Sequence, residues 1–306
     1  MPWWVFRRRR SVPASRTTGQ VAAEGAALPP LQSERRFLQE QPYMLPKDLG
    51  EVNRLDFQHY VLRALLRANY LAPIEQPRRI LDVGCGTGQW AFELCQQFPQ
   101  AEVVGVDLEQ IKATTPPSNY RFVQGDVLRG LPFADASFDF VHQRLLTSAL
   151  PLAAWPEVVR ELARVTAPRG WVELVEPGLG LRVTPAGPAN EQLLSMGTQL
   201  AAQRGLDAEG AVARSLKRYL HEARLVNIHV RTVEAPIGEW GGRIGSLLAL
   251  DLREIWKAIS APLAVHFNLS RQEVQDLINS ACQEWNSLHS RCSFIICYGQ
   301  KPFASS

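Results

Sequence analysis

The stretch ILDVGCGTG at residues 80–88 constrains the fold more than any other part of this 306-residue chain. A short, mainly apolar strand runs into three alternating glycines, Gly84, Gly86 and Gly88, and a helical pattern follows them. Such glycines let backbone amides approach a ligand, and the helix start adds unpaired N–H groups. A dinucleotide fingerprint needs a further glycine where this chain has Gln89, and a P-loop needs a lysine before Ser or Thr. The turn alone therefore indicates a nucleotide-type site and leaves the ligand open.

Strand-like and helix-like segments alternate from residue 79 onward. Strands separated by helices predict a parallel sheet with helices on both faces and right-handed crossovers. A helix is also expected over residues 48–70, where apolar residues recur at helical spacing. We expect Pro262 to break the chain between two C-terminal helices, which form an insertion over the strand ends. The expected strands are 79–83, 103–106, 120–124, 138–142, 171–175, 227–233 and 294–298, and the further expected helices are 90–98, 156–165, 189–204, 214–223, 244–259 and 271–287.

Two acidic residues stand where the second and third strands end. Asp107 ends the second strand, and Asp126 follows the third in a Gly-Asp-Val turn. Asp107 is placed to accept hydrogen bonds from ribose hydroxyls, and Asp126 to accept one from an adenine amino group. Each also has a plain structural interpretation, as a helix N-cap for Asp107 and a turn residue for Asp126. Open α/β sheets bind ligands at the carboxyl ends of their strands, so the glycine turn and both acids together predict an adenosine site.

Several segments resemble one protein family. Residues 80–88 look like the first motif of the class I S-adenosylmethionine-dependent methyltransferases, residues 131–139 (LPFADASFD) like the segment before their fourth strand, and residues 168–171 (PRGW) like the turn before their fifth. The stretches that resemble the UMTA/LaeA-like branch are YMLP at 43–46, RLDFQH at 54–59, PIG at 236–238 and YGQKP at 298–302. The resemblance implies a Rossmann-like α/β fold of seven strands, the last one antiparallel, with an N-terminal helical lid and a C-terminal helical insertion. It also implies S-adenosyl-L-methionine as the cofactor.

The resemblance also implies roles for individual residues. Gly84, Gly86 and Gly88 approach the methionine part of the cofactor, while Gln143 lies near its amino group and sulfonium. The residues expected to bind the cofactor are Tyr43, Asp82, Gly84, Cys85, Gly86, Gly88, Asp107, Leu108, Asp126, Val127 and Gln143. His59 and Glu176 are the candidates for a catalytic base or substrate contact, with His142 as a weaker one. Both His59 and Glu176 also have structural interpretations, as a core or capped histidine and as the cap of a turn.

Charge and composition divide the chain and restrict its partners. Residues 1–35 read as a disordered basic tail, residues 36–78 as the helical lid, and residues 79–302 as the methyltransferase domain with helical cover insertions at about 178–213 and 236–290. Most of the basic excess lies in the tail, so the nearly neutral body does not favour nucleic acid. No stretch approaches the ~20 apolar residues that stable membrane insertion requires. The five cysteines include no C-x-x-C pair, so no metal is expected and a cytoplasmic setting is predicted.

Methyl transfer to a small-molecule acceptor, such as a natural product, is the leading functional hypothesis. One alternative is a non-catalytic or regulatory LaeA-like protein that binds S-adenosylmethionine. A second is a cyclase of the same fold, and a nicotinamide-dependent dehydrogenase is a distant further alternative. A homo-oligomer formed through the N-terminal helix is left open.

Overall fold

The computed structural model describes residues 49–110, 115–180 and 182–303. Tyr43 and the tail expected at 1–35 lie outside the described residues. The elements in chain order are α1 (Leu49–Leu66), β1 (Arg79–Val83), α2 (Gln89–Gln97), β2 (Glu102–Asp107), β3 (Tyr120–Gln124), η1 (Val127–Arg129), β4 (Phe138–Arg144), η2 (Leu152–Ala154), α3 (Trp155–Val165), β5 (Thr166–Pro177), α4 (Pro188–Ala202), α5 (Ala211–Glu222), β6 (Val226–Pro236), η3 (Glu239–Gly241), α6 (Gly242–Ala258), α7 (Ser260–His266), α8 (Arg271–Ser287) and β7 (Arg291–Gln300).

The strands form a seven-stranded sheet in the order β3-β2-β1-β4-β5-β7-β6. Strands β1 to β5 pair in parallel, and β7 is antiparallel to both β5 and β6. Val83 pairs with Val106 on one side and with Gln143 on the other, so the carboxyl ends of β1, β2 and β4 are level. The predicted fold class, with its antiparallel last strand, is confirmed.

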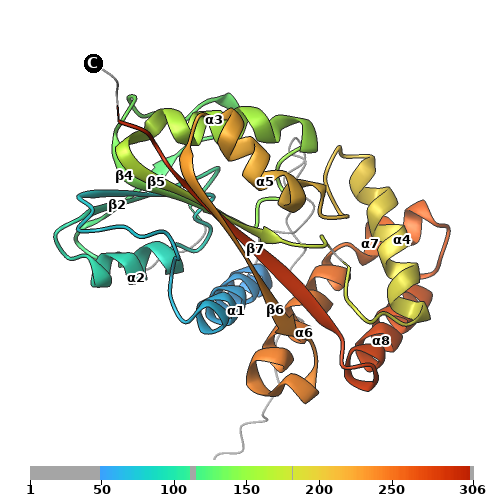
Figure 1. Ribbon diagram of the computed structural model, residues 1–306. Coiled ribbons are helices and arrows are strands. Elements are labelled where there is room, and N and C mark those ends of the chain that lie inside the picture. Colours follow the sequence, from blue (N-terminus) through green and yellow to red (C-terminus); the bar gives the residue numbers. More distant parts are fainter. Residues whose placement is uncertain (1–48, 111–114, 181, 304–306) are drawn as a thin grey trace, which may run out of the picture. The chain divides into compact units, whose positions relative to one another are not determined.

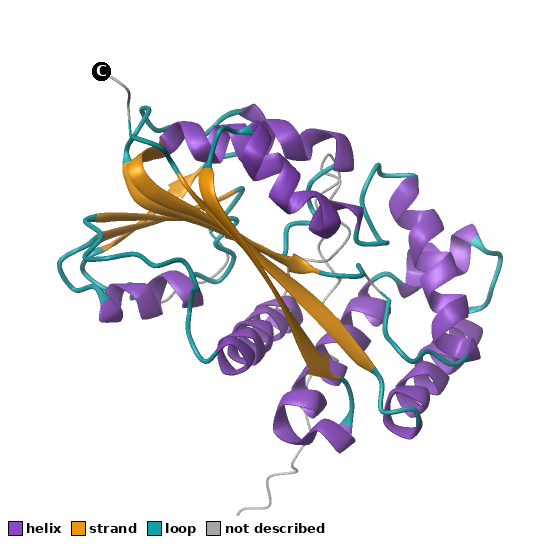
Figure 2. Ribbon diagram, viewed as in Figure 1, coloured by secondary structure: helices purple, strands orange, loops and turns teal. Residues whose placement is uncertain are grey.

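Helices cover both faces of the sheet (Figures 1 and 2). On one face, α3 and α5 bury Val159, Leu162 and Leu216 against the sheet. On the other, α2 buries Trp90 and Leu94 in a second apolar cluster. The face of α3 that is turned to the sheet is apolar and the opposite face is charged, which is the pattern of a surface helix packed on a core.

A third apolar core joins α1, α4, α6, α7 and α8 to the ends of β5 and β7. Its members include Val175 on β5 and Ile296 on β7. Pro262 does not break the chain as expected, because it lies in the first turn of α7, where a helix needs no N–H from that residue. None of the described helices is long and apolar enough to span a bilayer.

Candidate functional site

The glycine turn between β1 and α2 has a backbone that only glycine adopts without strain. Gly84, Gly86 and Gly88 have φ angles of 69°, 53° and 77°. The Gly84 N–H donates to the carbonyl of Val106 at 2.8 Å, which fixes the turn against the end of β2. A Cβ atom on Gly84 would lie 2.7 Å from Cδ2 of Leu146. Both conformation and space therefore require glycine at position 84.

Each of the two predicted acids accepts a hydrogen bond from a backbone N–H group. Asp107 Oδ2 accepts a hydrogen bond from the Gly86 N–H at 2.9 Å, so the acid of β2 and the glycine turn are in direct contact. Asp126 Oδ1 accepts from the Leu128 N–H at 3.0 Å and caps the short helix η1. The turn role of Asp126 is thus present in the structure. Its predicted contact with adenine stays a prediction.

Gln143 carries a fully buried side-chain amide at the end of β4, with no hydrogen-bond partner among the described residues. Its side chain has 0% exposure, and within the described residues neither Oε1 nor Nε2 has a hydrogen-bond partner. Leaving a buried amide unsatisfied costs about 1–3 kcal/mol. A ligand that offers both an acceptor and a donor would remove this cost. The site therefore fits a polar cofactor group at the position that the sequence assigns to Gln143.

Cys85 contributes backbone rather than a reactive thiol. Its Sγ lies 3.8 Å from the Tyr120 hydroxyl in the interior beneath the turn, and burial raises the pKa of the thiol well above its ordinary value. The remaining predicted contacts, Leu108 and Val127, are partly buried next to the two acids. The described residues include no group of three or more His, Cys, Asp or Glu side chains that would hold a metal ion.

Helix α1 is bound directly to the glycine turn and to α2. The Thr87 hydroxyl donates to Asp56 Oδ1 at 2.8 Å. Glu93 on α2 forms an ion pair with Arg63, with 2.7 Å between Oε2 and Nε. The other oxygen of Glu93, Oε1, lies 3.1 Å from His59 Nε2. On its other side, α1 forms a buried ion pair between Arg54 and Asp251 of α6 at 2.8 Å.

His59 points into this cluster with both ring nitrogens next to a partner. Arg144 Nη2 donates to His59 Nδ1 at 3.0 Å, so Nε2 carries the proton and faces Glu93. Burial, and next the charge of Arg144, lower the pKa of His59 to about 4. The imidazole is therefore neutral at pH 7. The predicted catalytic role of His59 stays a prediction, and the geometry favours a role in orienting Arg144.

Glu176 lies near the end of β5, and its side chain is fully buried next to the turn after β4. Its carboxylate accepts from the Leu146 N–H at 3.0 Å, from the Thr147 N–H at 3.1 Å and from the Thr147 hydroxyl. Burial raises the pKa of this carboxyl to about 7 although these hydrogen bonds act in the opposite direction. Glu176 thus organises the loop after β4, and its catalytic role stays a prediction.

Three buried titratable side chains form a chain across β1, β4 and β5. His142 Nδ1 lies 3.3 Å from Asp82 Oδ1, and its Nε2 lies 4.0 Å from Glu173 Oε1. The ring of His142 stacks on Trp90 with centroids 3.9 Å apart. Glu173 accepts the N–H groups of Leu71 and Ala72, each at 2.7 Å. Glu173, which was not predicted, therefore holds the chain after α1 against β5, while Asp82 and His142 connect β1 with β4. The predicted contact of Asp82 with the cofactor stays a prediction.

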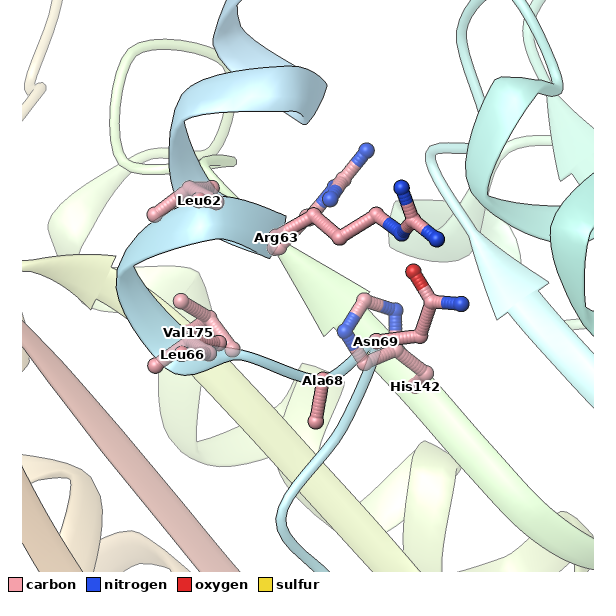
Figure 3. A pocket seen from close by; sticks show the side chains of 8 residues that line it. Leu62, Arg63, Leu66, Ala68, Asn69, His142 and Val175 are labelled. Carbon is pink, nitrogen blue, oxygen red and sulfur yellow. The ribbon is translucent and has the colours of Figure 1, made fainter. Parts of the chain in front are cut away.

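A small hollow lies between α1 and the ends of β4 and β5, and the space inside it is about 10 Å³ (Figure 3). One part of its wall is apolar, from α1 and β5, and the other is polar. The lining residues are Leu62, Arg63, Leu66, Ala68, Asn69, His142, Arg144 and Val175.

Comparisons with known proteins agree with this geometry. Residues 80–170 match the family described as a methyltransferase domain. The chain is 33% identical to methyltransferase str2 of Strobilurus tenacellus over 206 residues, covering 65% of this chain and 72% of that protein. It is 28% identical to methyltransferase pytC of Aspergillus terreus over 276 residues, covering 85% and 84%. It is also 28% identical to the secondary metabolism regulator laeA of Aspergillus flavus over 267 residues, covering 81% and 72%. The resemblance seen in the sequence is confirmed.

Proposed function

The chain belongs to the methyltransferase family, and we propose that it transfers the methyl group of S-adenosyl-L-methionine to a small-molecule acceptor such as a natural product. The observation that carries the proposal is the buried amide of Gln143, which has no hydrogen-bond partner among the described residues and lies level with the glycine turn. A catalytic pocket for a polar cofactor explains why this amide is left without a protein partner.

In the proposed complex, the residues of the turn and strand ends position the cofactor. Gly84, Gly86 and Gly88 present their backbone to its methionine part. The side-chain amide of Gln143 forms hydrogen bonds with polar groups of the same part. Asp107 holds the ribose, while Asp126 and its neighbour Val127 contact the adenine. The bound cofactor supplies an electrophilic methyl group on its sulfonium sulfur. The protein contributes mainly by holding the acceptor in line with that methyl group.

For an acceptor that must lose a proton, Glu176 is the proposed base. Burial raises the pKa of its carboxyl to about 7, and a base works best when its pKa is near the operating pH. An acceptor that is already nucleophilic needs no such step. Glu176 would then act only on the loop after β4.

The test of the proposal is product formation from isotope-labelled S-adenosylmethionine, incubated with the protein and a panel of small metabolites. We expect a labelled product, and we expect Gln143→Leu to weaken S-adenosylhomocysteine binding about tenfold, corresponding to ~1.4 kcal/mol. Gln192→Leu, a change at an exposed position of α4, is the matched control. Failure of the wild-type protein to bind S-adenosylhomocysteine would overturn the proposal.

A regulatory protein of the same fold is the second candidate, supported by the similarity to the regulator laeA. It predicts cofactor binding without turnover of any small metabolite. If the protein binds S-adenosylhomocysteine but none of the tested metabolites yields a labelled product, regulation is favoured over catalysis.

We further propose a reducing, cytoplasmic setting. The support is that all five cysteines, Cys85, Cys95, Cys282, Cys292 and Cys297, are free and partly or fully buried. Self-association through the N-terminal helix stays a proposal, and light scattering of the full chain tests it.

A further inference from the structure

We propose that Arg144 binds the carboxylate of an apolar, acidic methyl acceptor, and that His59 holds the guanidinium in place for this contact. This inference rests on the proposed function, because the ligand is the acceptor of that reaction. It adds a substrate class and a residue that recognises it.

The first observation is that Arg144 has no acidic partner in the part of the chain that the structure describes. Within the described residues, its guanidinium donates to His59 Nδ1 at 3.0 Å, and no carboxylate oxygen lies within 4.0 Å of it. Asp82 and Glu93 are near enough to favour the charged form, yet neither pairs with it. Glu93 is instead engaged by Arg63 at 2.7 Å. Buried or partly buried charges are normally paired, so the unpaired cation indicates an anionic ligand.

The second observation is the neighbour that Arg144 does have. His59 accepts from Nη2 and is itself 4% exposed, so one edge of the guanidinium is held by a rigid, neutral group. A guanidinium carries five N–H donors in a planar fork that matches the two oxygens of a carboxylate. With one donor used by His59, the remaining donors have no acceptor among the residues of the described chain.

The third observation is the hollow that Arg144 lines. Leu62 and Leu66 of α1 and Val175 of β5 supply its apolar wall, while Arg144, His142 and Asn69 supply the polar one. The space inside it is about 10 Å³, roughly that of one water molecule, so a carboxylate reaches Arg144 from the open side and the remainder of the acceptor stays outside. The combination of apolar and basic walls fits an apolar acid rather than a sugar or an amine.

Strand geometry separates this anion from the carboxylate of the cofactor. Successive residues of a strand point to opposite faces, so Arg144 and Gln143 are directed to opposite sides of β4. Gln143 is the residue assigned to the methionine part of the cofactor. Arg144 shares its side with His142 and faces α1, as their common place in the hollow shows. The acceptor is therefore the proposed source of the carboxylate.

The experiment uses benzoate and methyl benzoate as probes of the full chain saturated with S-adenosylhomocysteine. The wild-type complex should bind benzoate at least tenfold more tightly than its ester in a ligand-observed NMR titration. Arg144→Met should remove this preference, and Arg144→Lys should keep only part of it, because the charge remains and the fork does not. Arg160→Met, which removes an exposed arginine of α3, is the control for loss of net charge and should keep the preference.

A second titration identifies the source of the anion. S-adenosylhomocysteine carries the methionine carboxylate, whereas 5′-methylthioadenosine lacks it. Arg144→Met should bind both nucleosides as the wild type does, within about twofold, which also shows that the variant is folded. Weaker binding of S-adenosylhomocysteine alone would assign Arg144 to the cofactor and overturn the inference. Equal binding of benzoate and its ester by the wild type would also overturn it. Failure of the wild type to bind either nucleoside would instead refute the proposed function itself.

Discussion

Thr87 in the glycine turn donates its hydroxyl to Asp56 on α1, with 2.8 Å between Oγ1 and Oδ1. This bond connects the helix before the sheet to the turn that is proposed to hold the cofactor. Since Arg54 of the same helix pairs with Asp251 of α6, α1 also connects the turn to the helical layer. A ligand bound at the glycine turn or at the helical layer therefore contacts an element that is bonded to α1.

Replacing Thr87 with valine should weaken cofactor binding while preserving the shape of the side chain. The change removes one donor from a partly buried carboxylate, at a cost of roughly 1–2 kcal/mol. We expect the Kd for S-adenosylhomocysteine, measured by calorimetry, to rise about fivefold, or ~1 kcal/mol. Thr232→Val on the exposed strand β6 should leave the Kd unchanged. An unaltered Kd in Thr87→Val would show that the contact with α1 does not support the turn.

Gly84→Ala should impair both stability and cofactor binding. A left-handed backbone costs an alanine roughly 1–2 kcal/mol, and the new Cβ would approach Leu146 to 2.7 Å. We expect a loss of about that size in the free energy of unfolding and at least tenfold weaker binding of S-adenosylhomocysteine.

Gly205→Ala is a matched control for this change. Gly205 has a similar φ of 67°, and a Cβ there would meet nothing within 4 Å. The control should lose stability through backbone strain alone and keep the affinity for the cofactor. Equal affinities in the two variants would contradict a role for Gly84 in binding.

Local patterns in the sequence were sufficient to predict the sheet and the glycine turn. The alternation of strands and helices predicts parallel pairing, and the placement of Asp107 and Asp126 at strand ends follows from it. These features depend on neighbours that are close in sequence. The structure brings Asp107 and the turn together as expected, with the Gly86 N–H on the carboxylate.

The contacts of α1 could not be predicted in this way. Arg144 and His59 are 85 positions apart, and their bond depends on how α1 packs on the sheet. Glu173 is one of two acidic residues in β5, and nothing near it in the sequence shows that it accepts the N–H groups of Leu71 and Ala72. The sequence therefore identified candidate side chains, and tertiary packing decided which of them act together.

Glu173→Gln should make stability less dependent on pH. Burial raises the pKa of this carboxyl to about 7, whereas its ordinary value is 4.5. The folded state thus favours the neutral form of Glu173. The contribution of this residue to wild-type stability is therefore fully present below pH 4.5 and is lost as the pH rises through 7. A glutamine can still accept from Leu71 and Ala72 and does not ionise.

Denaturant unfolding at pH 5 and pH 8 tests this prediction. Relative to the wild type, Glu173→Gln should lose about 1–3 kcal/mol less between the two pH values. Part of the decline should persist, because Glu176 has a pKa raised to about 7 for the same reason. Glu191→Gln, at an exposed position, is the control. A decline as large as that of the wild type would contradict the assignment to Glu173.

His59→Gln separates a catalytic histidine from an orienting one. Glutamine can accept from Arg144 and donate to Glu93, but it cannot carry a proton in catalysis. Loss of a general base lowers turnover roughly 10²–10⁴-fold. We expect less than a tenfold loss, measured with the acceptor found in the labelling experiment, because the variant keeps Arg144 in place. A hundredfold loss with unchanged S-adenosylhomocysteine binding would instead establish His59 as a base.

The pH dependence of stability provides an independent measure of His59. Its pKa is lowered to about 4 in the folded chain, against 6.5 ordinarily, so acid protonates the unfolded chain first. Wild-type stability should therefore be fully present above pH 6.5 and decline as the pH falls toward 4. His59→Gln should reduce that decline by about 1–3 kcal/mol, whereas His221→Gln, an exposed change on α5, should not. An unchanged decline would mean that His59 is already protonated in the folded state, and a protonated ring could not accept from Arg144.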